Sequence, residues 1–330
     1  HHDHEHTEQG GLPTNWFHER DHPVHSLFSR ADPPWLANFP ANPSPDHPGS
    51  LPVDKLPKAW TDAYEAAVAN GKIPAIPPTT VSYMEGWAKY PDGFDPTSRE
   101  VCSSYEQCYT DTDLVDPPSG VIVISFDDGP ADGTATLLKH LGSTHQRATH
   151  FMIGSNIRDQ PDLFTQAFRQ GGDIAVHTYT HPYMTSLSDY GVLAELGYTM
   201  QIIHDSTDGR VPRYWRPPFG DMDNRVRAIA SEVFGLTPVM WNRDTNDWAM
   251  PDNQDPATIL TNVTEWLGGD SLKDTKGRML LEHELTEDTA NVFINTTWPL
   301  LLANHWKPLS VAQTWGHSLN YANAVSNADV

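Results

Sequence analysis

The sequence has 330 residues, a formal net charge of −22 at pH 7 and 38% hydrophobic residues. Such a negative charge would repel phosphate backbones, which argues against a protein whose main partner is nucleic acid. No stretch approaches the roughly 18 apolar residues of a membrane-spanning helix, and the 10% aromatic content excludes a largely disordered chain.

Proline sets the first third of the sequence apart from the rest. Residues 1–120 contain 17 of the 28 prolines, and proline at this frequency prevents long helices and strands. The exception is 58–70, where apolar residues fall at helical spacing. Because disordered tails are seldom aromatic, we expect 1–117 to be a mostly irregular arm that packs against the following domain. The aromatic residues concerned are Trp16, Phe17, Trp35, Phe39, Trp60 and Trp87.

The two cysteines, Cys102 and Cys108, stand six positions apart in C-S-S-Y-E-Q-C. This spacing suits a disulfide that closes a short loop, whereas a thiolate metal site would need cysteines that the sequence lacks. Asn262 and Asn295 open the N-glycosylation sequons N-V-T and N-T-T, which agree with an oxidising compartment. We therefore expect a processed form of a secreted protein, with these asparagines as its glycosylation sites.

From residue 121 onward, short apolar runs alternate with amphipathic stretches. The runs begin near residues 121, 148, 173, 213, 237, 278 and 306. Alternation at this period is typical of βα units around a parallel sheet. It predicts an α/β fold, with a distorted (β/α) barrel of about seven parallel strands, although a doubly wound open sheet would show the same alternation. No G-x-G-x-x-G follows the first run, which argues against a dinucleotide site.

Five polar motifs follow these runs, at the ends of the expected strands. They are S-F-D-D-G-P with Asp127 and Asp128, H-T-Y-T-H with His177 and His181, W-R-P-P-F-G at 215–220, D-T-N-D-W at 244–248 and L-L-E-H-E at 280–284. Adjacent carboxylates repel each other unless a cation lies between them or one is protonated. Two histidines joined by an aspartate form a metal set with open coordination positions, the pattern of a catalytic site. Each motif alone could equally be a turn or the start of a helix.

All five motifs occur in one order, and together they resemble those of carbohydrate esterase family 4, the NodB-like polysaccharide deacetylases. The resemblance covers about residues 118–315, and the proline-rich arm and secreted character are similar to fungal chitin deacetylases. It implies a NodB-homology catalytic domain over 118–315, between the arm at 1–117 and a C-terminal tail at 316–330.

The resemblance also implies the catalytic roles. Asp127 would be the general base, positioned by Arg216. His283 would be the general acid, because its near-neutral pKa suits protonation of a leaving amine, and Asp244 would orient it. Since an N-acetyl amide is unreactive, a bound metal would help by activating water and polarising the carbonyl.

The remaining site residues concern the metal and the substrate. The expected ligands of one divalent metal, zinc first and cobalt second, are Asp128, His177 and His181. Phe219 stands where the family usually has a tyrosine whose backbone amide helps form the oxyanion hole, a role that phenylalanine can keep. Trp248 matches a wall of the substrate groove, and Leu281 matches the residue lining the acetyl-methyl pocket.

We therefore expect a metal-dependent hydrolase that removes acetyl groups from N-acetylglucosamine polymers, with chitin as substrate. The alternatives are a deacetylase of peptidoglycan or acetylxylan, or a non-catalytic carbohydrate-binding protein of the cell wall on the same scaffold. We expect a monomer that binds chitin or chito-oligosaccharides, binds no nucleic acid and has no transmembrane segment. Its expected location is extracellular and associated with the cell wall, with a lipid anchor conceivable in a C-terminal part that has been trimmed.

Overall fold

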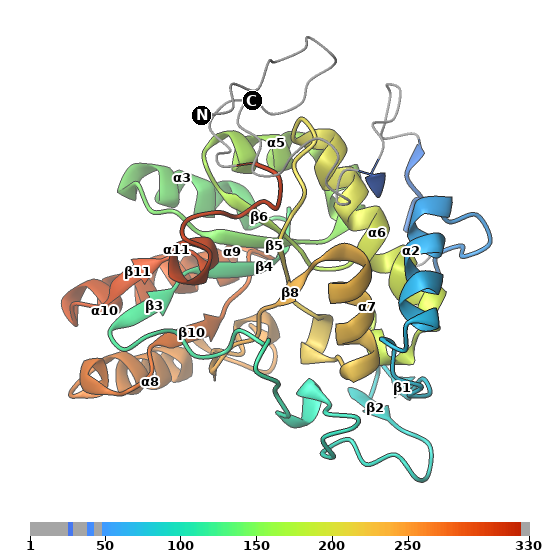
Figure 1. Ribbon diagram of the computed structural model, residues 1–330. Coiled ribbons are helices and arrows are strands. Elements are labelled where there is room, and N and C mark those ends of the chain that lie inside the picture. Colours follow the sequence, from blue (N-terminus) through green and yellow to red (C-terminus); the bar gives the residue numbers. More distant parts are fainter. Residues whose placement is uncertain (1–25, 29–37, 43–47, 325–330) are drawn as a thin grey trace, which may run out of the picture.

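The computed structural model describes residues 26–28, 38–42 and 48–324. Trp16, Phe17 and Trp35 lie outside these ranges. Parallel strands form the centre of the molecule and helices surround them (Figure 1). The central strands are β3 (Val121–Val123), β4 (Ser125–Gly129), β5 (Thr149–Met152), β6 (Asp173–Val176), β7 (Tyr214–Trp215), β8 (Thr237–Pro238), β9 (Arg243–Asp244), β10 (Arg278–Leu281) and β11 (Lys307–Leu309).

These strands form two sheets that share one continuous segment of chain. The first has the order β4–β5–β6–β7–β8 and the second has the order β11–β3–β10–β9, with every pair parallel. Only Ile124 separates β3 from β4, and a bridge between Asp127 and His283 joins β4 to the end of β10. At the other margin, no ladder between β8 and β9 occurs among the described residues, and Leu114 pairs with Val239 there.

The predicted α/β fold is therefore confirmed, and each of the seven predicted strand positions carries a strand, the first of them divided into β3 and β4. The two-residue strand β9 was not predicted, because Arg243 and Asp244 are polar and such a short segment has no apolar run. Among the described residues the strands do not close into a continuous barrel: β8 and β9 are not paired with each other, and the arm residue Leu114 pairs with Val239 at this margin.

Most helices around the strands match the predicted amphipathic stretches, whereas the short helices α4 (Gly154–Asp159) and α11 (Val311–Trp315) were not predicted. The others are α3 (Thr134–Thr144), α5 (Pro161–Arg169), α6 (Asp189–Ser206), α7 (Asn224–Phe234), α8 (Pro256–Leu267), α9 (Glu287–Val292), the π-helix η7 (Phe293–Thr297) and α10 (Trp298–Ala303). Side-chain N-caps start several of them: Ser188 accepts from the amide of Gly191 before α6, and Asp223 accepts from the amide of Val226 before α7. No helix in the described ranges is long and apolar enough to cross a bilayer.

The described part of the arm packs against the barrel domain. The helix predicted at 58–70 is α2 (Lys58–Ala69), which contacts α6 and α7 (Figure 1). Its Trp60 is fully buried and lies against Gly197, where an added Cβ would come within 2.5 Å of the indole ring. This close approach requires glycine in the middle of α6, despite the cost of glycine to a helix. The hairpin of β1 (Thr80–Ser82) and β2 (Trp87–Lys89) follows α2.

The C-terminal tail is also part of the packed structure as far as it is described. Tyr321 is 2% exposed and pairs with Pro212 in an isolated bridge. Asn320 donates to the carbonyl of Ile174, and Asn323 accepts from the amide of Val211. Residues 320–324 therefore pack beside β6 and the segment that leads into β7.

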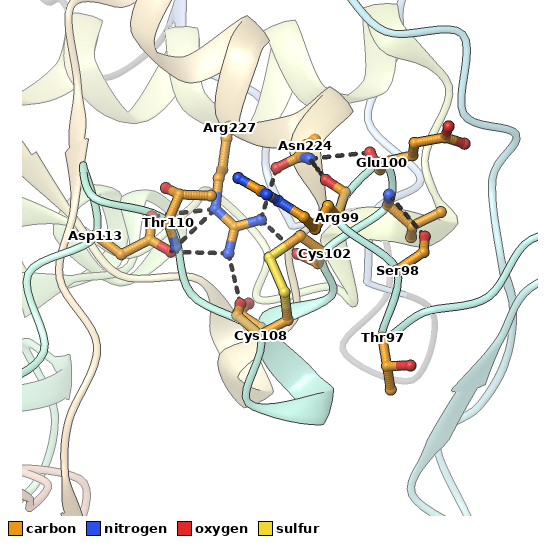
Figure 2. Close-up of a disulfide and its surroundings, with 12 residues drawn as sticks. Thr97, Ser98, Arg99, Glu100, Cys102, Cys108, Thr110, Asp113, Asn224 and Arg227 are labelled. Carbon is orange, nitrogen blue, oxygen red and sulfur yellow. Dashed lines mark hydrogen bonds and ion pairs between the residues drawn. A yellow bond between two sulfur atoms is a disulfide. The ribbon is translucent and has the colours of Figure 1, made fainter.

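Figure 2 shows the predicted disulfide between Cys102 and Cys108, which is present. The guanidinium of Arg227, on α7, lies against it and donates to the carbonyls of Cys102 and Cys108. The same group pairs with the carboxylate of Asp113 at 2.8 Å. One buried arginine thus fixes both ends of the disulfide loop to the barrel domain.

We expect Arg227→Ala to destabilise the protein by about 3–5 kcal/mol, because it leaves the buried Asp113 carboxylate without its partner. The free energy of unfolding, measured by chemical denaturation with the disulfide intact, checks this expectation. Lys139→Ala on the exposed face of α3 serves as the control, with an expected change within about 0.5 kcal/mol. Equal stability of the two variants would show that Arg227 does not anchor the loop.

Candidate active site

Three side chains from the ends of neighbouring strands form a cluster suited to a metal ion. Asp128 lies in β4, His177 follows β6, and His181 lies in the next loop. Their ligand atoms all lie within 4.8 Å of one another. Nε2 of His177 and Nε2 of His181 are each 3.2 Å from Oδ1 of Asp128. Strand β4 and the loop after β6, which lie on either side of β5, thus bring together the three ligands that the sequence predicted.

The chemistry of these three residues fits a divalent metal. Oδ1 of Asp128 is buried and has no hydrogen-bond partner among the described residues. Nδ1 of His177 lies 2.7 Å from the carbonyl of Arg216, which can only accept, so the proton is on Nδ1 and Nε2 keeps its lone pair. Ligand atoms about 2.0–2.1 Å from a tetrahedral zinc lie about 3.3 Å apart, close to the two distances observed. Burial opposes ionisation of Asp128, but the neighbouring His181 lowers its pKa well below the usual range.

The backbone at this cluster is held in an uncommon conformation. Asp128, Thr178 and His181 have φ of 72°, 66° and 64°, in the left-handed region that non-glycine residues seldom adopt. Glu195 of α6, completely buried, supports the segment between the two histidines. Its carboxylate accepts from the amides of Tyr179 and Thr180 at 2.7 and 2.8 Å, and from the Thr180 hydroxyl. Glu195 therefore positions both histidines without touching either one.

We expect Glu195→Ala to weaken metal binding by about 10–100-fold, the usual effect of losing a group that orients metal ligands. Glu195→Gln is the matched control, since an amide oxygen can still accept from the two backbone N–H groups. Metal affinity is measured by competition with a chelator, and the melting temperature of the metal-free protein is recorded alongside. The expectation fails if the alanine variant binds metal as tightly as the glutamine variant.

A second carboxylate, Asp127, lies beside the cluster and is fixed by Arg216. Both side chains are buried, and Nη1 of Arg216 donates to Oδ1 of Asp127 at 2.7 Å. The other nitrogens of the guanidinium donate to Ser125 Oγ and to the carbonyls of Val239 and Met240. Because each nitrogen of the guanidinium makes a hydrogen bond, Arg216 fixes the orientation of the Asp127 carboxylate. Oδ2 of Asp127 then lies 3.8 Å from Nε2 of His177. The predicted contact between Arg216 and Asp127 is present.

His283 lies two residues beyond the end of β10 and forms a bridge with Asp127 of β4. Its Nδ1 is 2.6 Å from Oδ1 of Asp247, and its backbone amide donates to Oδ2 of the same carboxylate. Its Nε2 is 3.9 Å from Oδ2 of Asp128. Burial alone would lower the pKa of His283, but the charge and hydrogen bond of Asp247, followed by Asp128 and Asp127, raise it to about 10. Asp247 thus favours the cationic imidazole, and Nε2 of His283 faces the metal cluster.

The prediction that Asp244 orients His283 is wrong. Asp244 ends β9, is exposed, and accepts from the amide of Asn246. The chain then turns into the 3-10 helix η5 (Asp247–Ala249), which places the completely buried Asp247 beside His283. The motif D-T-N-D-W contains both carboxylates, so the sequence held the signal, but spacing alone could not show which one faces the histidine.

The residues predicted to bind substrate surround this centre. Phe219, in η4 (Pro218–Gly220), has φ of 58°, and its ring centroid lies 4.7 Å from that of His181. Trp248 follows Asp247 and is 55% exposed, whereas Leu281 is buried at the end of β10. Their contacts with a substrate remain predictions.

The two predicted glycosylation positions lie away from the strands. Asn262 is half-buried on α8, and Asn295 is exposed on η7. The Thr297 hydroxyl of the second sequon is buried and bonds to Glu282. Modification at both positions stays a prediction.

Comparison with known proteins finds similar chains and folds. A family model described as polysaccharide deacetylase matches residues 115–239. Chitin deacetylase 3 of Cryptococcus neoformans var. neoformans is 40% identical over 328 residues, covering 97% of this chain and 77% of that protein.

Two solved structures share the fold. The chitin deacetylase of the fungal pathogen Colletotrichum lindemuthianum is 22% identical with a TM-score of 0.56, covering 63% of this chain and 94% of that one. The peptidoglycan deacetylase PdaC of Bacillus subtilis is 25% identical with a TM-score of 0.52, covering 62% and 93% of the two chains. The fold is therefore common to proteins named for different substrates.

Proposed function

The chain belongs to the polysaccharide deacetylase family, carbohydrate esterase family 4, and from this membership we propose that it is a chitin deacetylase. It removes N-acetyl groups from N-acetylglucosamine polymers, releasing acetate and leaving glucosamine units. The observation that supports this chemistry is that three groups lie together in one cluster. These are a fixed carboxylate, Asp127, a cationic histidine, His283, and a metal set built around Asp128.

Hydrolysis of an acetamide requires a base for water and an acid for the leaving nitrogen. Asp127 takes the proton from the attacking water, and Arg216 keeps the free oxygen of Asp127 facing the ligand cluster. Water oxygen adds to the carbonyl carbon as that proton leaves. His283 then gives its Nε2 proton to the nitrogen as the carbon–nitrogen bond breaks. Acetate and a free amine are the products.

Asp247 has two effects on His283. Its Oδ1 accepts the Nδ1 proton, so that the transferable proton is on Nε2, and its charge stabilises the imidazolium before transfer. Asp128, His177 and His181 would hold the divalent metal, for which we propose zinc, with cobalt as a substitute. When bound there, such an ion supplies Lewis acidity, which polarises the carbonyl and makes water more acidic.

Chitin is the proposed substrate because the relative matched over 97% of this chain is a chitin deacetylase. The disulfide and the predicted sequons support action outside the cell, at the cell wall.

Acetate release from chito-oligosaccharides, peptidoglycan fragments and acetylated xylan, with His283→Ala as the inactive control, tests the substrate. We expect release to be fastest from chito-oligosaccharides, with one new amine for each acetate. Faster release from peptidoglycan or xylan would overturn chitin as the substrate. Binding of chito-oligosaccharides with no acetate from any of the three would instead favour the non-catalytic carbohydrate-binding alternative.

A further inference from the structure

Aromatic side chains of the arm meet Phe219 next to the metal ligands. The ring of Phe219 contacts His181, with centroids 4.7 Å apart, and stacks on Tyr183 at 4.1 Å with planes 12° apart. Tyr83, in the turn between β1 and β2, lies 6.0 Å from Phe219. Tyr105, inside the disulfide loop, lies 6.2 Å from Tyr183. Two separate segments of the arm thus extend the aromatic lining of the active site.

Three of these rings are open to solvent and one is not. Tyr83, Tyr105 and Phe219 are 37%, 36% and 41% exposed, whereas Tyr183 beneath them is 3% exposed. We call Tyr83 and Tyr105 of the arm, together with Phe219 of η4, the arm platform. Single exposed aromatic residues are ordinary, but three that all contact the same buried ring, Tyr183, beside a catalytic cluster are typical of a binding surface.

The arm platform is held firmly from below. The Tyr83 hydroxyl accepts from the amide of Tyr183 at 3.1 Å, and the Tyr105 hydroxyl donates to the carbonyl of Gly86 at 2.8 Å. Ser104, beside Tyr105, donates from Oγ to the carbonyl of Gly220 at 2.6 Å, which ties the disulfide loop to η4. Surfaces ordered before binding lose less entropy when a ligand arrives.

We propose that the arm platform binds a pyranose ring of the polymer next to the unit being deacetylated. This inference rests on the proposed function. The acetamide must reach the metal cluster, and Phe219 contacts a ligand histidine, so a neighbouring sugar of the same chain comes over these rings. The hydrogen-bearing faces of a pyranose are apolar and flat, and they stack on aromatic rings, while the sugar hydroxyls stay in water. The arm would therefore set the preference for longer substrates.

The test is the double variant Tyr83→Leu/Tyr105→Leu, which keeps apolar bulk but removes both rings. KM for a chito-pentasaccharide is expected to rise about three- to tenfold, with a smaller rise for the disaccharide and little change in kcat. Tyr83→Phe/Tyr105→Phe keeps the rings but loses both hydroxyl hydrogen bonds, so its KM should rise clearly less than that of the leucine variant. Tyr109→Leu is the matched control, because Tyr109 is also on the arm and 38% exposed.

Melting temperatures of all variants verify folding. If the double variant is unstable, Tyr105→Leu alone is compared with Tyr105→Phe, because the Tyr105 hydroxyl makes one bond to an exposed carbonyl. An unchanged pentasaccharide KM in the folded leucine variant overturns the arm platform. So does an equal loss on both substrates, which would show a structural effect. If the wild-type protein releases no acetate from any chito-oligosaccharide, the proposed function itself fails, an outcome distinct from the other two.

Discussion

Replacing Asp247 by asparagine is expected to lower kcat/KM by about 10²–10⁴-fold and to move the alkaline limb of its pH profile to lower pH. His283 must be protonated to release the amine, so activity falls as pH rises through its pKa. Asp247 is the main group that raises this pKa to about 10. Without the charge of Asp247 the pKa drops, and the cationic form is lost at a lower pH. The rate falls because the imidazole loses its anionic partner.

The matched control is Asp244→Asn, in the same motif. Asp244 is exposed and bonds to the amide of Asn246 instead of His283, so we expect the alkaline limb to move far less and the rate to stay within a few fold. Profiles of kcat/KM against pH for both variants and the wild type decide the matter. If the alkaline limb moved further in Asp244→Asn than in Asp247→Asn, Asp244 of β9 would be the main group that raises the pKa of His283.

Asp127→Asn is expected to reduce kcat by about 10²–10⁴-fold, the usual range for a lost general base. The amide oxygen can still accept from Nη1 of Arg216, so the site should keep its shape. Asp127 is not one of the three clustered ligands, so the metal content should stay near that of the wild type.

His177→Ala, which removes a ligand, is the comparison for this variant. It should lose both metal and activity, whereas Asp127→Asn loses activity alone. Elemental analysis and acetate release on the same preparations separate the two effects. Retention of most of the rate in a folded Asp127→Asn protein would assign the base to another group.

The sequence predicted the parts of the fold and site that depend on local pattern. Apolar runs of several residues marked the strands, and helical spacing marked α2. Motifs at strand ends located the cluster of Asp128, His177 and His181, because parallel strands bring their carboxyl ends to one edge. Strand β9 was not predicted because its two polar residues form no apolar run.

Other parts depend on contacts between distant segments, which local pattern cannot show. The choice between Asp244 and Asp247 is made by the turn into η5 beneath His283. Glu195 lies on α6, whose residues are mostly buried, and only the packing of this helix against the loop of His177 and His181 shows which amides the carboxylate binds. The proline-rich sequence of the arm likewise did not predict that Tyr105 would lie near the active site.

The central claim is that acetate release depends on the metal held by Asp128, His177 and His181. The most direct measurement compares acetate release from chito-oligosaccharides before chelation, after chelation and after return of zinc, with metal content verified by elemental analysis at each stage. We expect activity to disappear with the metal and to recover when zinc or cobalt is restored. Full activity in protein shown to be metal-free would contradict the claim.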